Sequence, residues 1–257
     1  MNIIQAIILG IVEGITEFLP ISSTAHLIIA SKLFHIPQTD FQKFFEVYIQ
    51  SGAILAVFLL YIKYVMKHKE VIKNVIISFF PTAIVGFLFY KVIKTVFFES
   101  TLLIIGAMIL FGIVFLVTEY LIKSKKLVLK KSLNKVTWKE AFIIGLNQSL
   151  AVVPGVSRAG IVMISMMGLG YKRSESAMYS FLLAVPTIVV ASGYDLFKMR
   201  GMLIHSTQYL PVLMIGFVAS FITAYIAIKW LVGFLQKSSL VPFGIYRIIL
   251  GLTLLFI

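Results

Sequence analysis

The apolar residues of this chain fall into six stretches, each long enough to cross a lipid bilayer, which takes about 20 residues of helix. They lie at approximately 44–62, 74–92, 101–122, 176–196, 208–231 and 241–257. Hydrophobic residues make up 60% of the 257 and charged residues 13%, whereas soluble domains carry about 25% charged residues. One core of this size cannot bury so much apolar side chain, which excludes a soluble enzyme, a nucleic-acid-binding domain and a disordered chain. Because lipid leaves free backbone groups without hydrogen bonds, the sequence predicts an all-α integral membrane protein.

The net charge of +13 lies in the loops between these stretches and does not indicate a nucleic-acid partner. If the loop after the first span is cytoplasmic, 15 of the 23 Lys and Arg residues are cytoplasmic, six lie outside, and Arg158 and Arg247 lie within membrane segments. Positive residues concentrate on the cytoplasmic side of membrane proteins, so both termini are expected outside. The chain has no cysteine, which excludes disulfides, thiolate nucleophiles and cysteine-bound metals.

Two further apolar regions, 3–33 and 138–169, are interrupted by proline and small polar residues. The interruptions are Leu19–Thr24 and Val153–Arg158, and proline breaks the hydrogen-bond ladder of a helix. Each half of such a region holds only about 10–16 residues, too few to cross a bilayer. We therefore predict two re-entrant helical hairpins; a kinked spanning helix followed by a loop is the alternative.

The two interrupted regions resemble each other. Gln5–Gly10 matches Glu140–Gly145 at an offset of 135 residues, whereas Pro20 and Ser23 match Pro154 and Ser157 at an offset of 134. Each hairpin is followed by three predicted spans, so the second copy must enter the membrane inverted, from the cytoplasm, an arrangement known among membrane proteins. The prediction is a single membrane domain, with repeats at about 1–122 and 138–257 joined by a basic cytoplasmic loop, 123–137. Chance similarity between apolar segments is the alternative.

Ionisable residues inside a membrane are costly and often functional. Glu13 and Glu17 are four residues apart, on one face of a helix. Two carboxylates this close suit a hard divalent cation, Mg²⁺ or Ca²⁺; the alternatives are a water-filled vestibule or a shared proton. Glu46 and Gln50, one turn apart at the start of the first span, are candidate supporting partners.

Three hydroxyl side chains, Ser22, Ser23 and Thr24, follow Pro20 and begin a helix. Helix N-termini offer free N–H groups and partial positive charge, which suits phosphate. His26, near the same end, is a candidate acid, base or nucleophile. The structural alternative is that one hydroxyl caps the helix and that His26 is only a hydrogen-bonded structural group.

The second interruption carries Gly155, Ser157 and Arg158, and follows Gln148. Gly155 permits close backbone approach, and Arg158 offers a permanently charged fork of donors for phosphate oxygens. We regard these four residues as candidate substrate-binding groups. The alternative for Arg158 is structural neutralisation of a buried glutamate.

Together these motifs resemble the bacitracin-resistance family of undecaprenyl pyrophosphate phosphatases. Glu13–Leu27 is similar to the family's first signature and Pro154–Gly160 to its second, while Phe45–Gly52 and Phe181–Pro186 also fit. The chain departs from the family at Ala25, where Gly is usual, at Ala159, where Ser is usual, and at Met178. The resemblance covers nearly the whole chain.

The resemblance implies a phosphatase of the inner membrane that hydrolyses undecaprenyl pyrophosphate to the monophosphate, recycles the lipid carrier of cell-wall polymers and gives bacitracin resistance. It also implies dependence on a divalent cation. The family's site residues map to Glu13, Glu17, Ser23, His26, Ser157 and Arg158. The predicted topology places the opening of this site on the outer, periplasmic face.

The nucleophile remains open at this stage: Glu17 or His26 could activate water, or Ser23 or His26 could be phosphorylated directly. A lipid-phosphate flippase or transporter is the alternative function, because inverted repeats are common in carriers. The expected partners are a polyprenyl pyrophosphate lipid and the membrane lipids. Monomer and homodimer are both compatible with the sequence.

The topology can be tested with single cysteines, because the native chain has none. A cysteine replacing Ser132 should not react with a membrane-impermeant thiol reagent in intact cells and should react after permeabilisation. A cysteine replacing Lys32, on the outer side in this topology, is the control that should react in both. Labelling of Ser132→Cys in intact cells would refute the assignment.

Overall fold

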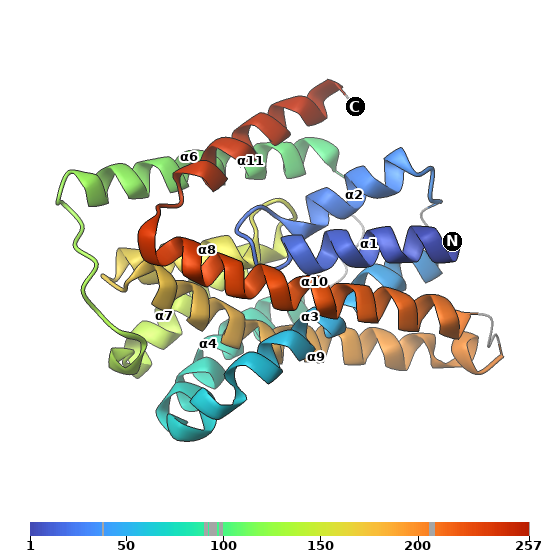
Figure 1. Cartoon of the computed structure of the whole chain (residues 1–257), viewed down its shortest axis with the longest axis horizontal. Helices are drawn as coiled ribbons and strands as arrows, with labels where there is room; N and C mark the ends of the chain where they lie inside the picture. Colours follow the sequence, from blue (N-terminus) through green and yellow to red (C-terminus); the bar gives the residue numbers. More distant parts are fainter. Residues whose placement is uncertain (38, 90–91, 93–96, 98–99, 206–208, 257) are drawn as a thin grey trace.

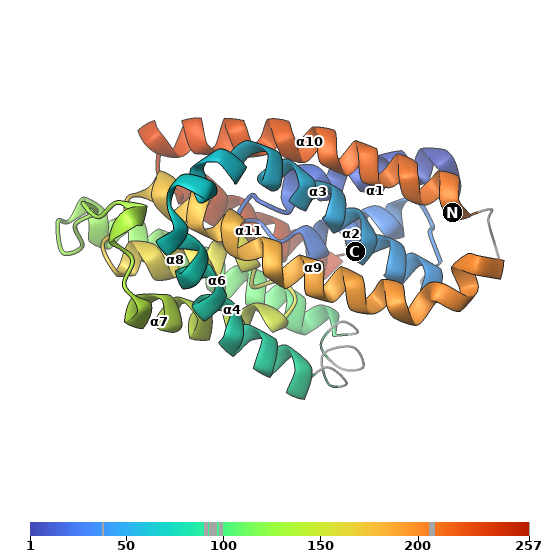
Figure 2. The ribbon, with the colours of Figure 1, turned by 90° about the horizontal axis from the view of Figure 1, so that it is seen from below.

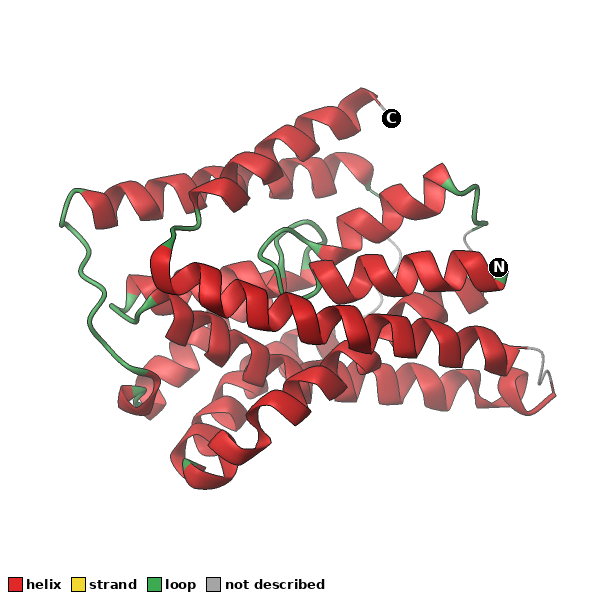
Figure 3. Ribbon diagram, in the orientation of Figure 1, coloured by secondary structure: helices red, strands yellow, loops and turns green. Residues whose placement is uncertain are grey.

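The computed structural model describes the chain apart from residues 38, 90–91, 93–96, 98–99, 206–208 and 257. The described residues form helices joined by short loops, with one isolated bridge between Lys131 and Tyr171 and no strand (Figure 3). The α-helices are α1 Ile3–Thr16, α2 Ser23–Leu33, α3 Asp40–Lys67, α4 Lys69–Leu88, α6 Thr101–Lys123, α7 Trp138–Gln148, α8 Arg158–Gly168, α9 Arg173–His205, α10 Leu210–Lys237 and α11 Val241–Thr253.

Five of these helices, α3, α4, α6, α9 and α10, are long and apolar enough to cross a membrane. They correspond to the first five predicted spans, so the prediction of a multi-pass membrane protein is confirmed; residues 90–91, 208 and 257 of the predicted spans lie outside the described residues. The sixth predicted span, 241–257, is not confirmed. Its helix α11 has 13 residues and passes into a 3₁₀ turn at Leu254–Phe256, which leaves it short of the roughly 20 residues that a span needs.

The two interrupted regions each form a pair of short helices, α1 with α2 and α7 with α8. Asn2 caps α1 and Thr137 caps α7, and each makes a capping box with the residue three positions on, Gln5 or Glu140. This arrangement satisfies two otherwise free N–H groups at each helix start. The 135-residue offset between Gln5 and Glu140 therefore has a structural counterpart.

The same offset continues to the second helix of each pair. Ser22 precedes α2 and Ser157 precedes α8, and both helices have 11 residues. The structural equivalent of Ser157 is therefore Ser22, and the sequence-based pairing of Ser23 with Ser157 was wrong by one residue. The prolines misled that pairing, because Pro20 and Pro154 stand at different distances from the helix that follows.

In Figure 1 the N-terminus lies toward the right end of the molecule and the C-terminus at its upper edge, right of the centre, whereas the loop from α6 to α7 lies at the left end. The turns of the two hairpins lie between these ends, near the middle of the molecule (Figures 1 and 3). The polar turns are thus held deep inside the helical bundle, where the long helices surround them.

The first helix of each hairpin packs against a long helix from the other half of the chain. Helix α1 packs on α10, and α7 packs on α4; the two pairs lie on opposite sides of the molecule in the view from below (Figure 2). Glycines allow these close approaches: a Cβ at Gly10 would lie 2.5 Å from the Gly216 carbonyl oxygen, and one at Gly145 would lie 2.2 Å from that of Ser78. Such contacts interlock the two halves.

The close contact between Gly145 and the backbone of Ser78 predicts that a larger residue at position 145 lowers the stability of the fold. Gly145→Ala should lower the thermal unfolding temperature in detergent, because the added methyl overlaps backbone; overpacking of this kind costs about 1–3 kcal/mol. Gly106→Ala in α6 is the matched control, since a Cβ there meets no atom within 4 Å and alanine favours a helix. Equal unfolding temperatures for the two variants would contradict this account of the packing.

Candidate active site

The turns that link α1 to α2 and α7 to α8 share an unusual backbone conformation. Ser22 has φ 73° and Ser157 has φ 71°, the left-handed region that non-glycine residues rarely adopt. Strain of this kind persists only where the surroundings enforce it, and it is concentrated at functional sites. The matching strain at equivalent positions identifies the two turns as the candidate functional region.

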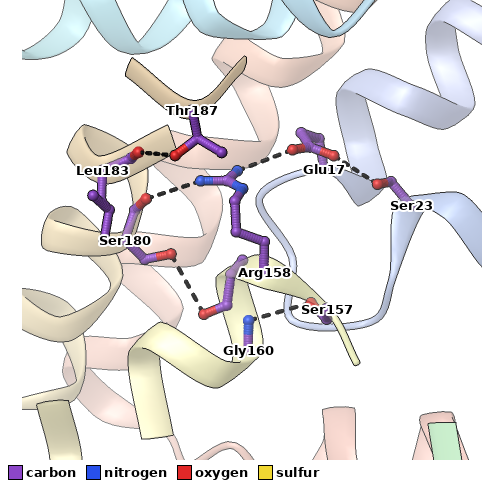
Figure 4. Close-up of polar contacts among 9 residues, drawn as sticks. Glu17, Ser23, Ser157, Arg158, Gly160, Ser180, Leu183 and Thr187 are labelled. Atoms are coloured by element: carbon purple, nitrogen blue, oxygen red, sulfur yellow. Dashed lines mark hydrogen bonds and ion pairs between the residues drawn. The ribbon is translucent and has the colours of Figure 1, made fainter. Parts of the chain in front are cut away.

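An ion pair joins the two turns (Figure 4). Arg158 Nη2 donates to Glu17 Oε1 at 2.9 Å, and the side chains of both residues are largely buried. On its other oxygen, Glu17 accepts a hydrogen bond of 2.6 Å from the Ser23 hydroxyl. The contact brings together an acid of the first turn and an arginine of the second, both of which were predicted as candidate site residues from the sequence.

Helix α9 supports the Arg158 side chain. Arg158 Nη1 donates to the Ser180 carbonyl at 3.1 Å, and its guanidinium lies 5.9 Å from the centre of the Phe18 ring. The Ser157 hydroxyl accepts from the Gly160 amide at 3.2 Å and so caps α8. The guanidinium is therefore held at the start of α8, with Nη2 directed toward Glu17 of the first turn and Nη1 toward α9.

A cavity of about 160 Å³ lies between the two turns. Its wall combines a carboxylate, a guanidinium, hydroxyl groups and an amide. The polar residues that line it are Glu17, Ser22, Ser23, Thr24, Gln50, Ser157, Arg158 and Thr187, and Gly155 contributes from the second turn. Seven predicted site residues thus share one cavity: Glu17, Ser22, Ser23, Thr24, Gly155, Ser157 and Arg158.

Glu13 lies behind this cavity and is completely buried. Neither of its carboxylate oxygens has a hydrogen-bond partner among the described residues, and the carboxyl groups of Glu17 and Glu46 add negative charge to its surroundings. An unpartnered buried carboxylate is costly, so this position calls for a proton or a cation. The described residues contain no cluster of three or more His, Cys, Asp or Glu suited to a metal, so a cation here would depend on the Glu13–Glu17 pair.

Glu46 and Gln50 on α3 were predicted as supporting partners, and they take different places. Glu46 accepts hydrogen bonds from the Gln42 amide at 2.9 Å and from the Ser31 hydroxyl at 3.2 Å. Gln50 lines the cavity itself. Helix α3 therefore contributes one half-buried acid, Glu46, and one amide, Gln50, at the cavity wall.

Two predicted site residues lie away from the cavity. His26 Nδ1 donates to the Ser22 carbonyl at 2.7 Å, and its Nε2 is 2.6 Å from the Tyr246 hydroxyl on α11. Gln148 is buried between α7 and α4, where its amide donates to the Thr82 hydroxyl at 2.8 Å. Neither residue lines the cavity, so the structure places both among supporting contacts.

Sequence reasoning missed two residues near this site. Thr187 lines the cavity from α9, and the only sequence signal was a hydroxyl following Pro186 within a span. The second is Arg247, which was predicted only as a charge within a membrane segment. It is completely buried and donates hydrogen bonds to both turns.

Ala25 and Ala159, two of the positions at which the chain departs from the family pattern, both lie within helices. Ala25 lies within α2 and is not among the described residues with positive φ, so its added methyl does not meet a conformational barrier. Ala159 lies in the first turn of α8, where its carbonyl accepts from the Ser180 hydroxyl at 3.4 Å.

Fold and site together define a multi-pass helical membrane protein whose paired hairpin turns enclose a buried polar cavity. A family model described as bacitracin resistance protein BacA matches residues 6–253. The chain therefore belongs to this family, as the sequence motifs predicted.

Relatives of known name match over almost their whole length. The chain is 48% identical to the undecaprenyl-diphosphatase of Wolinella succinogenes, with 100% of this chain and 98% of that protein covered. It is 47% identical to the undecaprenyl-diphosphatase of Persephonella marina, with 99% and 98% covered. It is 45% identical to that of Aquifex aeolicus, with 97% and 96% covered.

Proposed function

We propose that this protein is an undecaprenyl-diphosphatase, which hydrolyses undecaprenyl pyrophosphate to undecaprenyl phosphate and inorganic phosphate. The activity would recycle the lipid carrier for cell-wall synthesis and give resistance to bacitracin. The observation that carries the proposal is the contact of Glu17 with Ser23 on one side and Arg158 on the other, inside a membrane-embedded cavity. The names of the relatives agree with it.

Phosphate binding would use Arg158 and the start of α2. The guanidinium offers forked donors that match phosphate oxygens. Helix α2 begins at Ser22 without a side-chain cap, so its first N–H groups remain available to an anion at the positive end of the helix dipole. Fixed donors of this kind stabilise the charge that develops on phosphoryl oxygens during transfer.

Glu17 is placed to accept a proton from the attacking group. The 2.6 Å hydrogen bond from Ser23 matches the arrangement of a hydroxyl nucleophile and its base. A water molecule in the cavity is the alternative nucleophile, with Glu17 again as base. His26 fits a nucleophilic role less well, because it does not line the cavity and both of its ring nitrogens already have hydrogen-bond partners.

We also propose that Glu13 and Glu17 hold a divalent cation, Mg²⁺ or Ca²⁺. The unpartnered oxygens of Glu13 support this assignment, and Mg²⁺ is usually bound by one or two carboxylates together with substrate phosphates and water. When bound, the cation would neutralise negative charge on the pyrophosphate.

The proposed architecture is a pair of inverted-topology repeats, 1–122 and 138–257, with both hairpins re-entrant. The equal offsets of the caps, the equal lengths of α2 and α8, and the crossed packing of α1 on α10 and α7 on α4 support it. The protein would lie in the inner membrane, with the basic 123–137 loop in the cytoplasm and the site open to the periplasmic face. The positive-residue bias supports this orientation.

The first test is phosphate release from undecaprenyl pyrophosphate by purified protein in detergent, with and without a chelator. A phosphatase releases phosphate in this assay, whereas a pure flippase or transporter releases none. The flippase alternative is based on the same arrangement, in which two repeats meet at a site in the middle of the molecule, because many transporters share it.

Glu17→Gln should reduce turnover to the background rate, because the amide can neither accept the proton nor hold a cation. Excess chelator should do the same to the native protein. Glu140→Gln is the control: Glu140 pairs with Lys131 at 2.8 Å, outside the cavity, so turnover should be retained. Full activity of the native protein in excess chelator would disprove the cation assignment.

Arg158→Ala should reduce kcat/KM by the equivalent of about 3–4 kcal/mol, because it removes a fixed donor to the phosphoryl oxygens. It should also destabilise the fold, because Glu17 is left buried without its ionic partner. Arg158→Lys should recover only part of the loss, since an ammonium cannot make the forked contact. Arg173→Lys, which alters a partly buried pair with Glu119 away from the cavity, should retain turnover. Turnover near the native level in Arg158→Ala would contradict the proposed phosphate site.

A further inference from the structure

Arg247 of α11 is a buried arginine without an acidic partner in the part of the chain that the structure describes. Its side chain is completely enclosed, and the described ion pairs do not include it. An unpaired charge in the interior of a membrane protein is costly and needs a compensating role. Arg247 therefore requires an explanation beyond packing.

The two ends of the guanidinium bind one carbonyl from each hairpin turn. Nη1 donates to the Pro20 carbonyl at 3.2 Å, and Nη2 donates to the Gly155 carbonyl at 2.5 Å. Pro20 and Gly155 each stand two residues before the strained serine of their turn, Ser22 or Ser157. The arginine thus contacts equivalent positions of the two hairpins at the same time.

The surroundings of Arg247 hold its guanidinium plane in place. The guanidinium lies 5.3 Å from the centre of the Phe115 ring on α6, and α6 and α11 cross closely at Gly112 and Gly244. The guanidinium of arginine holds its donors at two ends of one rigid plane. The single ammonium group of a lysine cannot bridge two carbonyls in the same way.

Tyr246, the residue before Arg247 in α11, adds a second connection to the first turn. The Tyr246 hydroxyl is 2.6 Å from His26 Nε2, and His26 Nδ1 donates to the Ser22 carbonyl. Tyr246 and Arg247 therefore connect α11 to the first turn at two points, and Arg247 alone connects it to the second turn among the described hydrogen bonds.

We propose that Arg247 is a positioning residue for the phosphatase reaction: it clamps the two hairpin turns together so that Glu17 and Ser23 face Arg158 across the cavity. This inference rests on the proposed function. It does not require Arg247 to touch the substrate, since both of its Nη atoms already bind the turn carbonyls. Misplacing reacting groups by about 1 Å costs on the order of 10²-fold in rate, so loosening the turns should lower kcat more than it raises KM.

Three variants separate positioning from stability. Arg247→Met keeps the length of the side chain and removes both donors, so kcat should fall by about 10²-fold. Arg247→Lys should lie between this variant and the native protein. Ile248→Ala is the matched control, because Ile248 packs on Gly112 of α6 and makes no hydrogen bond to either turn; it should lower the unfolding temperature and leave kcat near the native value.

The second readout is the distance between the turns, which does not depend on activity. Spin labels can be placed at Ile15 and Leu150, which are exposed near the first and second turn, because the chain has no native cysteine. Pulsed electron resonance should give one narrow distance distribution for the native background and for Ile248→Ala, and a broader one for Arg247→Met. If Arg247→Met does not fold, Arg247→Lys takes its place in both measurements.

The proposal is overturned if the distance distribution of the folded variant stays narrow, or if kcat falls no further than in Ile248→Ala. Native kcat in Arg247→Lys would also overturn it, because a single contact would then suffice. If the native protein releases no phosphate from undecaprenyl pyrophosphate, the proposed function fails, whereas the distance measurements still decide whether Arg247 clamps the turns.

Discussion

The ion pair between Glu17 and Arg158 is the contact on which the rest of this site depends. It joins residues 141 positions apart in the chain, and it forms only because both hairpins end near the middle of the bundle. Two buried charges lose much of their hydration, and their attraction offsets that loss only when geometry and further hydrogen bonds are good. Ser23 and the Ser180 carbonyl supply those bonds. The crossed packing of the hairpins on α10 and α4 holds the two charges in register.

Much of this arrangement was predictable because membrane burial makes polar residues conspicuous. An acid or arginine within an apolar segment points to a site, so Glu17 and Arg158 could each be identified as candidate site residues from the sequence alone. The direction of a side chain after a helix break could not be predicted, because it depends on the backbone dihedrals of the turn. Hence His26 was expected in the cavity and instead contacts Tyr246, and the register of Ser22 with Ser157 was missed by one residue.

The two halves are alike in backbone and different in chemistry. Glu13 and Gln148 stand at the same 135-residue offset and are both completely buried. Gln148 bonds to Thr82 between α7 and α4, whereas Glu13 has no hydrogen-bond partner among the described residues. An amide at this position serves packing, and a carboxylate requires a counter-charge. Sequence comparison of the halves pairs these positions but does not show that only one of them serves the cavity.

The charges around the cavity explain why binding of a pyrophosphate would need more positive charge than the protein supplies. Within and beside the cavity, Glu13 and Glu17 face Arg158 and, behind the turns, Arg247. When the two carboxylates are ionised, these four groups are neutral in total. A pyrophosphate brings several further negative charges into a region of low dielectric, where uncompensated charge is expensive. A phosphate that took the Arg158 contact from Glu17 would leave Glu17 without its partner. A divalent cation between the carboxylates and the pyrophosphate would remove both penalties at once, and its charge would be required only when substrate is present.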